Sequence, residues 1–134
     1  MQKMENPSVP STLEDQQRTK LAIDHNPGTG PRIVFCGGFK SHMRGTKACY
    51  LHALAQREGW AFTRFDYQGH GESPGDFEAG TLSCWLEDTL SVIDACGDEP
   101  LLLVGSSMGG WIALLAALKR PQRVAGLLVL ACAT

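Results

Sequence analysis

The sequence predicts an α/β fold, in which a mostly parallel sheet carries helices on both faces. Apolar runs typical of buried strands alternate along the chain with helical patterns of about 12–16 residues. The strongest strand pattern, at residues 101–104, has four large aliphatic side chains in succession, as in a strand buried on both faces of a parallel sheet. A chain of 134 residues is long enough to bury a substantial core in one domain.

The first predicted strands follow a polar N-terminal segment. Residues 1–17 contain two prolines and are expected to form a flexible arm, whereas residues 18–134 are assigned to the folded domain. Strands are predicted at residues 19–25 and 32–36. The first alternates apolar and polar residues, and a dense run of turn residues separates the two.

Two helices and another strand are predicted next. Residues 45–58 show apolar residues at helical spacing, and Gly59 supplies the stop signal. Residues 60–66 form the third predicted strand. Thr81 is predicted to cap a second helix that runs to about residue 96. The apolar stripe of that helix is Leu82, Trp85, Leu86, Leu90, Ile93 and Cys96, and the side chains expected to face water are Glu87, Asp88, Ser91 and Asp94.

A G-x-S-x-G motif occupies residues 105–109, between the strongest strand pattern and a helix with almost no polar face, as expected at the centre of a fold. A chain that turns from strand to helix so quickly strains its central residue, and Gly105 and Gly109 lack the Cβ atoms that would collide there. Such a turn holds one hydroxyl at the carboxyl edge of the sheet, beside free helix N–H groups that favour negative charge. Ser107 is therefore predicted to be a nucleophile. An ordinary turn with a serine N-cap is the structural alternative.

A second part of the same site is predicted at residues 37–39, Gly-Gly-Phe, which end an earlier strand. The carboxyl ends of parallel strands meet at one edge of the sheet, so this turn is expected near Ser107. A tetrahedral intermediate needs two N–H donors for its oxyanion. The backbones of Phe39 and Met108 are predicted to supply them, with a plain strand-to-helix turn as the alternative.

Other polar residues are predicted to have structural roles. The loop at residues 66–75 lacks G-x-G-x-x-G spacing and is interpreted as a turn rather than a dinucleotide site. Lys40, Arg44 and Lys47 form a basic group that would suit a substrate carboxylate, although a solvated helix start is favoured. Their neighbours His42, Cys49 and His52 match no zinc spacing, so no metal site is predicted, and Cys49 is attributed to core packing. The four histidines, each expected at the surface or in a turn, are His25, His42, His52 and His70.

Composition argues against several classes of partner. A net charge of −2 gives no electrostatic reason to expect nucleic acid, and no apolar run reaches the length of a membrane span. The first 17 residues have no apolar signal region and contain acidic residues, which favours a cytoplasmic protein. The five cysteines are odd in number and lack C-x-x-C spacing, which is typical of reduced, mostly buried thiols.

Residues 18–134 resemble the α/β-hydrolase family. The resemblance lies in residues 105–110, in the Gly-Phe turn at residues 38–39 and in the F-D-x-x-G-x-G-x-S loop at residues 65–73. Further short matches resemble the branch of that family that contains the palmitoyl-protein thioesterase and the acyl-glucuronide esterase. The resemblance implies an eight-stranded sheet, hydrolysis of a small-molecule acyl ester or thioester through an acyl-enzyme, and no cofactor.

The sequence departs from that family in one respect. Family members carry the triad in the order Ser, Asp or Glu, then His, yet no Asp, Glu or His follows Ser107. The chain is therefore expected to be the N-terminal half of a serine hydrolase, truncated after a strand at residues 124–131, with little activity alone because its serine lacks a base. The alternative is a non-catalytic homologue that acts by binding, or by self-association through its exposed last strand.

Overall fold

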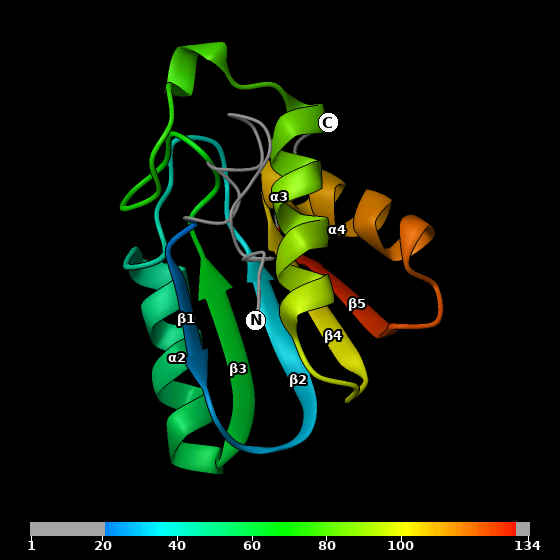
Figure 1. Cartoon of the computed structure of the whole chain (residues 1–134). Coiled ribbons are helices and arrows are strands. Elements are labelled where there is room, and N and C mark those ends of the chain that lie inside the picture. The colour runs from blue at the N-terminus through cyan, green and yellow to red at the C-terminus, as the bar shows by residue number, and fades with distance from the viewer. Residues whose placement is uncertain (1–20, 131–134) are drawn as a thin grey trace, which may run out of the picture.

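The computed structural model describes residues 21–130 as a five-stranded sheet with helices packed on both faces (Figure 1). The strand order is β1-β3-β2-β4-β5. β1 pairs antiparallel with β3, and the other neighbours are parallel. The mostly parallel α/β sheet predicted from the sequence is therefore confirmed. The strands are β1 (Ile23–Asn26), β2 (Thr29–Cys36), β3 (Trp60–Phe65), β4 (Leu101–Ser106) and β5 (Val124–Leu130).

Alternating side chains on the strands build one core on each face of the sheet. Helix α2 (Thr46–Glu58) covers one face, where Phe35 of β2 packs in a cluster with Ala48 and Ala55. Val34, next to Phe35, points to the other face and packs in the larger cluster formed with helices α3 (Leu82–Ala95) and α4 (Met108–Lys119). A short 3-10 helix, η1 (Phe77–Ala79), precedes α3.

The helix signals in the sequence are confirmed, whereas two strand boundaries differ. Gly59 ends α2 with φ 76° and donates its N–H to Ala55. The Thr81 hydroxyl accepts the Cys84 N–H at 3.1 Å and caps α3. β1 begins only at Ile23, and β2 begins at Thr29 because this residue still pairs with β3 and donates its N–H to the Gly59 carbonyl. The predicted arm at residues 1–17 and Cys132 lie outside the described residues.

Three side-chain predictions are wrong. Asp88 is fully buried rather than facing water, because its carboxylate accepts the backbone N–H of Gln68 at 2.8 Å and the Gln68 side-chain amide at 2.7 Å. Cys49 is exposed, and its thiol donates to the Arg44 carbonyl. Helix α4 is not surrounded by protein in the described part of the chain. Its outer side exposes Trp111, Leu114 and Leu118.

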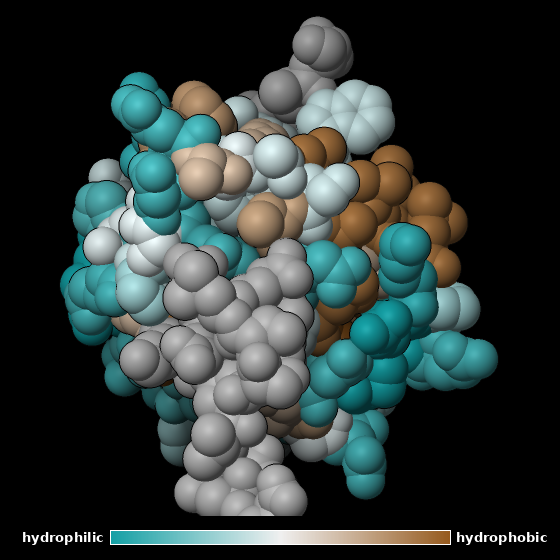
Figure 2. All heavy atoms as spheres, turned by 45° about the horizontal axis from the view of Figure 1, so that its top comes forward, coloured by the Kyte–Doolittle hydropathy of each residue, from teal (hydrophilic) through white to brown (hydrophobic). Residues whose placement is uncertain are grey.

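Much apolar surface on one side of the molecule has no covering element among residues 21–130. Figure 2 shows hydrophobic residues gathered on the right, the side on which α4 and β5 lie in Figure 1. On the sheet face that carries α2, a groove of about 370 Å³ runs beside β4 and β5, lined almost wholly by apolar residues that include Ile33, Leu102 and Leu128. None of the described helices is both long and apolar enough to cross a bilayer.

Candidate active site

Ser107 occupies the strained turn between β4 and α4. Its backbone lies at φ 58° and ψ −122°, a conformation that L-residues adopt only when the surrounding structure enforces it. Close packing enforces it here. A Cβ atom on Gly109 would lie 2.0 Å from the Cys36 carbonyl oxygen, and one on Gly105 would lie 2.3 Å from the Gly109 carbonyl oxygen. The two glycines thus let β2, β4 and α4 meet, and Ser107 is left exposed at the carboxyl edge of the sheet.

The Gly38–Phe39 turn lies directly against Ser107. A Cβ atom added to Gly38 would lie 3.4 Å from the Ser107 Cβ, at van der Waals contact, which shows how closely the turn approaches the serine. The turn is closed by a hydrogen bond of 3.1 Å from the Ser41 N–H to the Gly38 carbonyl, with Lys40 at φ 61°. Within residues 21–130, the backbone N–H groups of Phe39 and Met108 have no hydrogen-bond acceptor. The structure therefore brings both predicted donor residues to the edge that carries the serine.

His70 is hydrogen-bonded to this turn and holds it in place. It is 3% exposed, and its Nε2 accepts the Lys40 N–H at 3.2 Å while its Nδ1 donates to the Gln68 carbonyl at 3.1 Å. A carbonyl can only accept and an N–H can only donate, so the ring is the neutral tautomer with its proton on Nδ1. The ring also packs edge-to-face on Trp85, at 5.0 Å between centroids.

Tyr67 and Asp66 complete the support. The Tyr67 hydroxyl donates to the Gly37 carbonyl at 2.9 Å, and burial raises the pKa of this phenol well above its ordinary value, so it stays a donor. The Asp66 carboxylate accepts the N–H groups of Met43 at 2.7 Å and Glu72 at 2.9 Å. The loop at residues 66–75 is a structural turn, as predicted. Residues of this loop also hold the segment around Phe39 in place through hydrogen bonds. This supporting role was not predicted, although the F-D-x-x-G-x-G-x-S pattern at residues 65–73 was a signal for it in the sequence.

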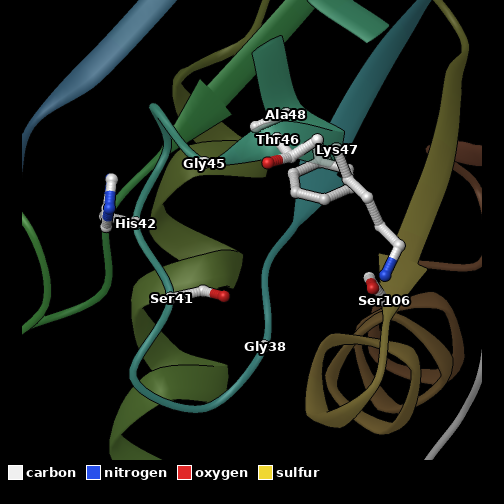
Figure 3. A pocket seen from close by; sticks show the side chains of 9 residues that line it. Gly38, Ser41, His42, Gly45, Thr46, Lys47, Ala48 and Ser106 are labelled. Atoms are coloured by element: carbon white, nitrogen blue, oxygen red, sulfur yellow. The ribbon is translucent and has the colours of Figure 1, made fainter. Parts of the chain in front are cut away.

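The prediction of surface or turn positions holds for His25 and His42, which are exposed, and for His70, which lies in a turn, while His52 is half-buried. His70 lies in a turn but is buried, because two hydrogen bonds and three aromatic rings surround it. His25 contacts the Thr63 hydroxyl at 2.8 Å, and His52 lies 4.0 Å from an Asp24 carboxylate oxygen. His42 is exposed on the side of a pocket away from Ser106 (Figure 3). None of the four is hydrogen-bonded to Ser107 in the described part of the chain.

The arrangement defines the class of protein. A buried parallel strand, a strained serine and an apolar helix form the strand–turn–helix arrangement in which the G-x-S-x-G motif was predicted to lie. A profile of the family described as serine aminopeptidase, S33, matches residues 29–134. The chain belongs to this family of α/β-hydrolases.

Particular relatives refine this assignment. The chain is 46% identical over 123 residues to the mitochondrial palmitoyl-protein thioesterase ABHD10 of Pongo abelii, and 45% identical to that of Homo sapiens. Each alignment covers 92% of this chain and 40% of the relative. Among solved structures, mouse α/β-hydrolase domain-containing protein 10 superposes with a TM-score of 0.79 and 41% identity, over 81% of this chain and 44% of the mouse chain. A putative hydrolase from Agrobacterium vitis gives a TM-score of 0.77 and 41% identity, over 84% and 48%.

The relatives confirm the resemblance and correct one prediction. The similarity to the palmitoyl-protein thioesterase branch stands, and this chain spans about 40% of the length of those relatives. Because these relatives are mitochondrial, they point to mitochondria, and the predicted cytoplasmic localisation is wrong. Short sorting segments rather than the fold determine localisation, and the composition of residues 1–17 did not predict it correctly.

Proposed function

We propose that the chain carries the nucleophile and the oxyanion donors of a serine hydrolase that acts on carboxylic esters or thioesters. The backbone of Ser107 is the observation that carries the proposal. Ser107 is exposed, has a strained φ of 58°, and lies between Gly105 and Gly109, both of which pack closely against backbone atoms. This geometry presents one hydroxyl to a substrate. The names of the relatives, which are thioesterases and hydrolases, support the same reaction class.

The reaction would proceed through an acyl-enzyme. The Ser107 Oγ attacks the carbonyl carbon and loses its proton to a base, and the carbonyl oxygen becomes an oxyanion that accepts the N–H groups of Phe39 and Met108. Collapse of this intermediate expels the alcohol or thiol and leaves an ester on Ser107. Attack by water then releases the carboxylic acid and restores the hydroxyl.

The base does not come from His70, because both of its ring nitrogens are already hydrogen-bonded. No other described histidine is bonded to Ser107. We therefore expect the chain by itself to turn over p-nitrophenyl esters slowly. Serine hydrolases that lack triad members typically keep about 10³–10⁴-fold acceleration over water, from oxyanion stabilisation and binding.

Covalent labelling tests the nucleophile without needing turnover. The chain would be incubated with a fluorophosphonate, and its intact mass followed over time. Because no described residue serves as a base for Ser107, we expect labelling to be slow but selective, with one adduct per chain at high reagent concentration, mapped to Ser107 and lost in Ser107→Ala. Ser83→Ala, which removes an exposed serine of α3, serves as the matched control and should label like the wild type. If Ser107→Ala formed the adduct at the same rate as the wild type, the proposal would be overturned.

A second candidate function is association through the sheet edge. β5 is the last strand of the sheet and exposes Leu127, Leu128 and Val129. An edge strand with unpaired backbone groups and apolar side chains favours pairing with another strand. We propose self-association of the chain through β5 as this alternative, and its test is given below with the whole molecule.

A further inference from the structure

A pocket of about 190 Å³ lies between the Gly38 turn and the start of α2 (Figure 3). Gly38 lines the pocket and also contacts Ser107, because a Cβ atom at Gly38 would lie 3.4 Å from the Ser107 Cβ and 3.8 Å from the Ser41 Oγ. A group bound in the pocket would therefore lie next to a carbonyl carbon held at Ser107. The polar side chains that line it are Ser41, His42, Thr46, Lys47 and Ser106.

Only one of the three neighbouring basic side chains is available to a ligand in this pocket. The Arg44 guanidinium pairs with Glu72 at 2.7 Å. The Lys40 ammonium lies over aromatic rings, at 5.9 Å from the Phe39 centroid and 5.5 Å from that of Phe77. Lys47 has no acidic partner among residues 21–130, and Figure 3 shows its ammonium directed toward Ser106.

Ser106 gives an independent sign of a ligand. The residue is 6% exposed, its hydroxyl faces the pocket in Figure 3, and this hydroxyl makes no hydrogen bond within residues 21–130. The hydroxyl oxygen is open to the pocket, since Arg123 Nε is the only fully buried side-chain nitrogen or oxygen without a partner among the described residues. A ligand that accepts a hydrogen bond would satisfy this hydroxyl.

The start of α2 adds to the positive character of the pocket. The N-cap Gly45 has no side chain to accept the free N–H groups of the first turn, and that turn contains no acidic residue. A 13-residue helix carries partial positive charge at this end. Lysine, hydroxyl and helix terminus together make a site for an anion, and nothing in the described lining supplies a negative charge.

We propose that this pocket is an anion subsite, in which Lys47 and Ser106 bind a carboxylate carried by the substrate a few bonds from the scissile carbonyl. The chemical class is an ester or thioester of a short dicarboxylic acid, whose free carboxylate would occupy the pocket. The role in substrate selection rests on the proposed hydrolase function. The binding itself does not, so the two can fail separately.

Ligand titration followed by NMR tests the site without any reaction. The chain would be titrated with N-methylsuccinamate, and in parallel with the neutral, similarly shaped N,N′-dimethylsuccinamide. We expect saturable shifts of the Lys47 and Ser106 backbone amides with the anionic probe, and a dissociation constant at least about tenfold lower than for the neutral one, as for one charge-assisted hydrogen bond. Higher salt should weaken the anionic probe only.

Variants assign the effect to the two residues. Lys47→Met should bring both probes to the same weak affinity, and Ser106→Ala should weaken the anionic probe several-fold. Lys119→Met, at the far end of α4, is the matched control and should bind like the wild type. Equal affinity for both probes, no saturable binding, or unchanged binding in Lys47→Met would overturn the subsite. Labelling of Ser107 by a fluorophosphonate would still report on the hydrolase function in any of these cases.

Discussion

His70 shows how one buried side chain can organise a site that it does not enter. Its ring bridges the Lys40 N–H and the Gln68 carbonyl, and therefore connects the turn that carries Phe39 to the loop at residues 66–75. Gln68 in turn is held by the buried carboxylate of Asp88. The position of the Phe39 N–H thus depends on a chain of hydrogen bonds that ends on α3.

We expect His70→Phe to destabilise the chain by about 1–3 kcal/mol. The substitution keeps an aromatic ring among Tyr67, Phe77 and Trp85 but leaves the partly buried Lys40 N–H unpaired, whereas the Gln68 carbonyl still accepts the Trp85 indole N–H at 3.2 Å. Urea unfolding followed by circular dichroism measures the change. His42→Ala removes an exposed ring and should shift the free energy of unfolding by less than about 0.5 kcal/mol. Equal stability of the His70 variant and the wild type would contradict this role.

At the scale of the elements, the junction of β2, β4 and α4 determines the geometry of the candidate site. α4 starts so close to β2 that the carbonyls of Cys36 and Gly37 lie where a Gly109 side chain would be. Cys36 is the last residue of a strand held on both sides by parallel pairing, and Gly37 follows it directly, so their carbonyls have little freedom to move. The strained backbone of Ser107 is a consequence of this packing.

Gly109→Ala is therefore expected to cost about 3 kcal/mol or more, because a Cβ at 2.0 Å from a backbone oxygen must force α4 away from the sheet. The loss would appear as a lower urea midpoint, together with slower fluorophosphonate labelling of Ser107. Gly37→Ala is the matched control from the same junction, since its Cβ would find only ordinary contacts at 3.7 Å and beyond. Similar losses in both variants would show that crowding at Gly109 is not the cause.

At the scale of the whole molecule, the described chain buries the two cores of a sheet but leaves much of one side apolar. β5 forms the end of the sheet, and the groove beside β4 and β5 lies on the face that α2 covers only in part. Leu128 is 55% exposed on that strand, and Leu118 is 69% exposed on α4. Two separate apolar regions could therefore mediate association.

We expect the β5 edge to be the region that associates, because within residues 21–130 it has backbone groups without a pairing strand as well as apolar side chains. Sedimentation equilibrium over a range of concentrations should show dimers or larger species for the wild type. Leu128→Lys should shift the distribution toward monomer, whereas the control Leu118→Lys should not. A wild-type chain that remains monomeric at high concentration would be evidence against this alternative.

The sequence by itself determined the order of the elements, the parallel sheet, the family and the position of the turn between β4 and α4, because periodicity, caps and the spacing of glycines are local signals. Tertiary structure alone decided which polar side chains are buried. Asp88 looked like a water-facing helix residue, yet its carboxylate binds Gln68 of the loop at residues 66–75, and His70 of the same loop is buried where it accepts the distant Lys40 N–H. It also decided which of three adjacent cations stays available, because Glu72 and the ring of Phe77 reach Arg44 and Lys40 from distant parts of the chain and leave Lys47 beside Ser106.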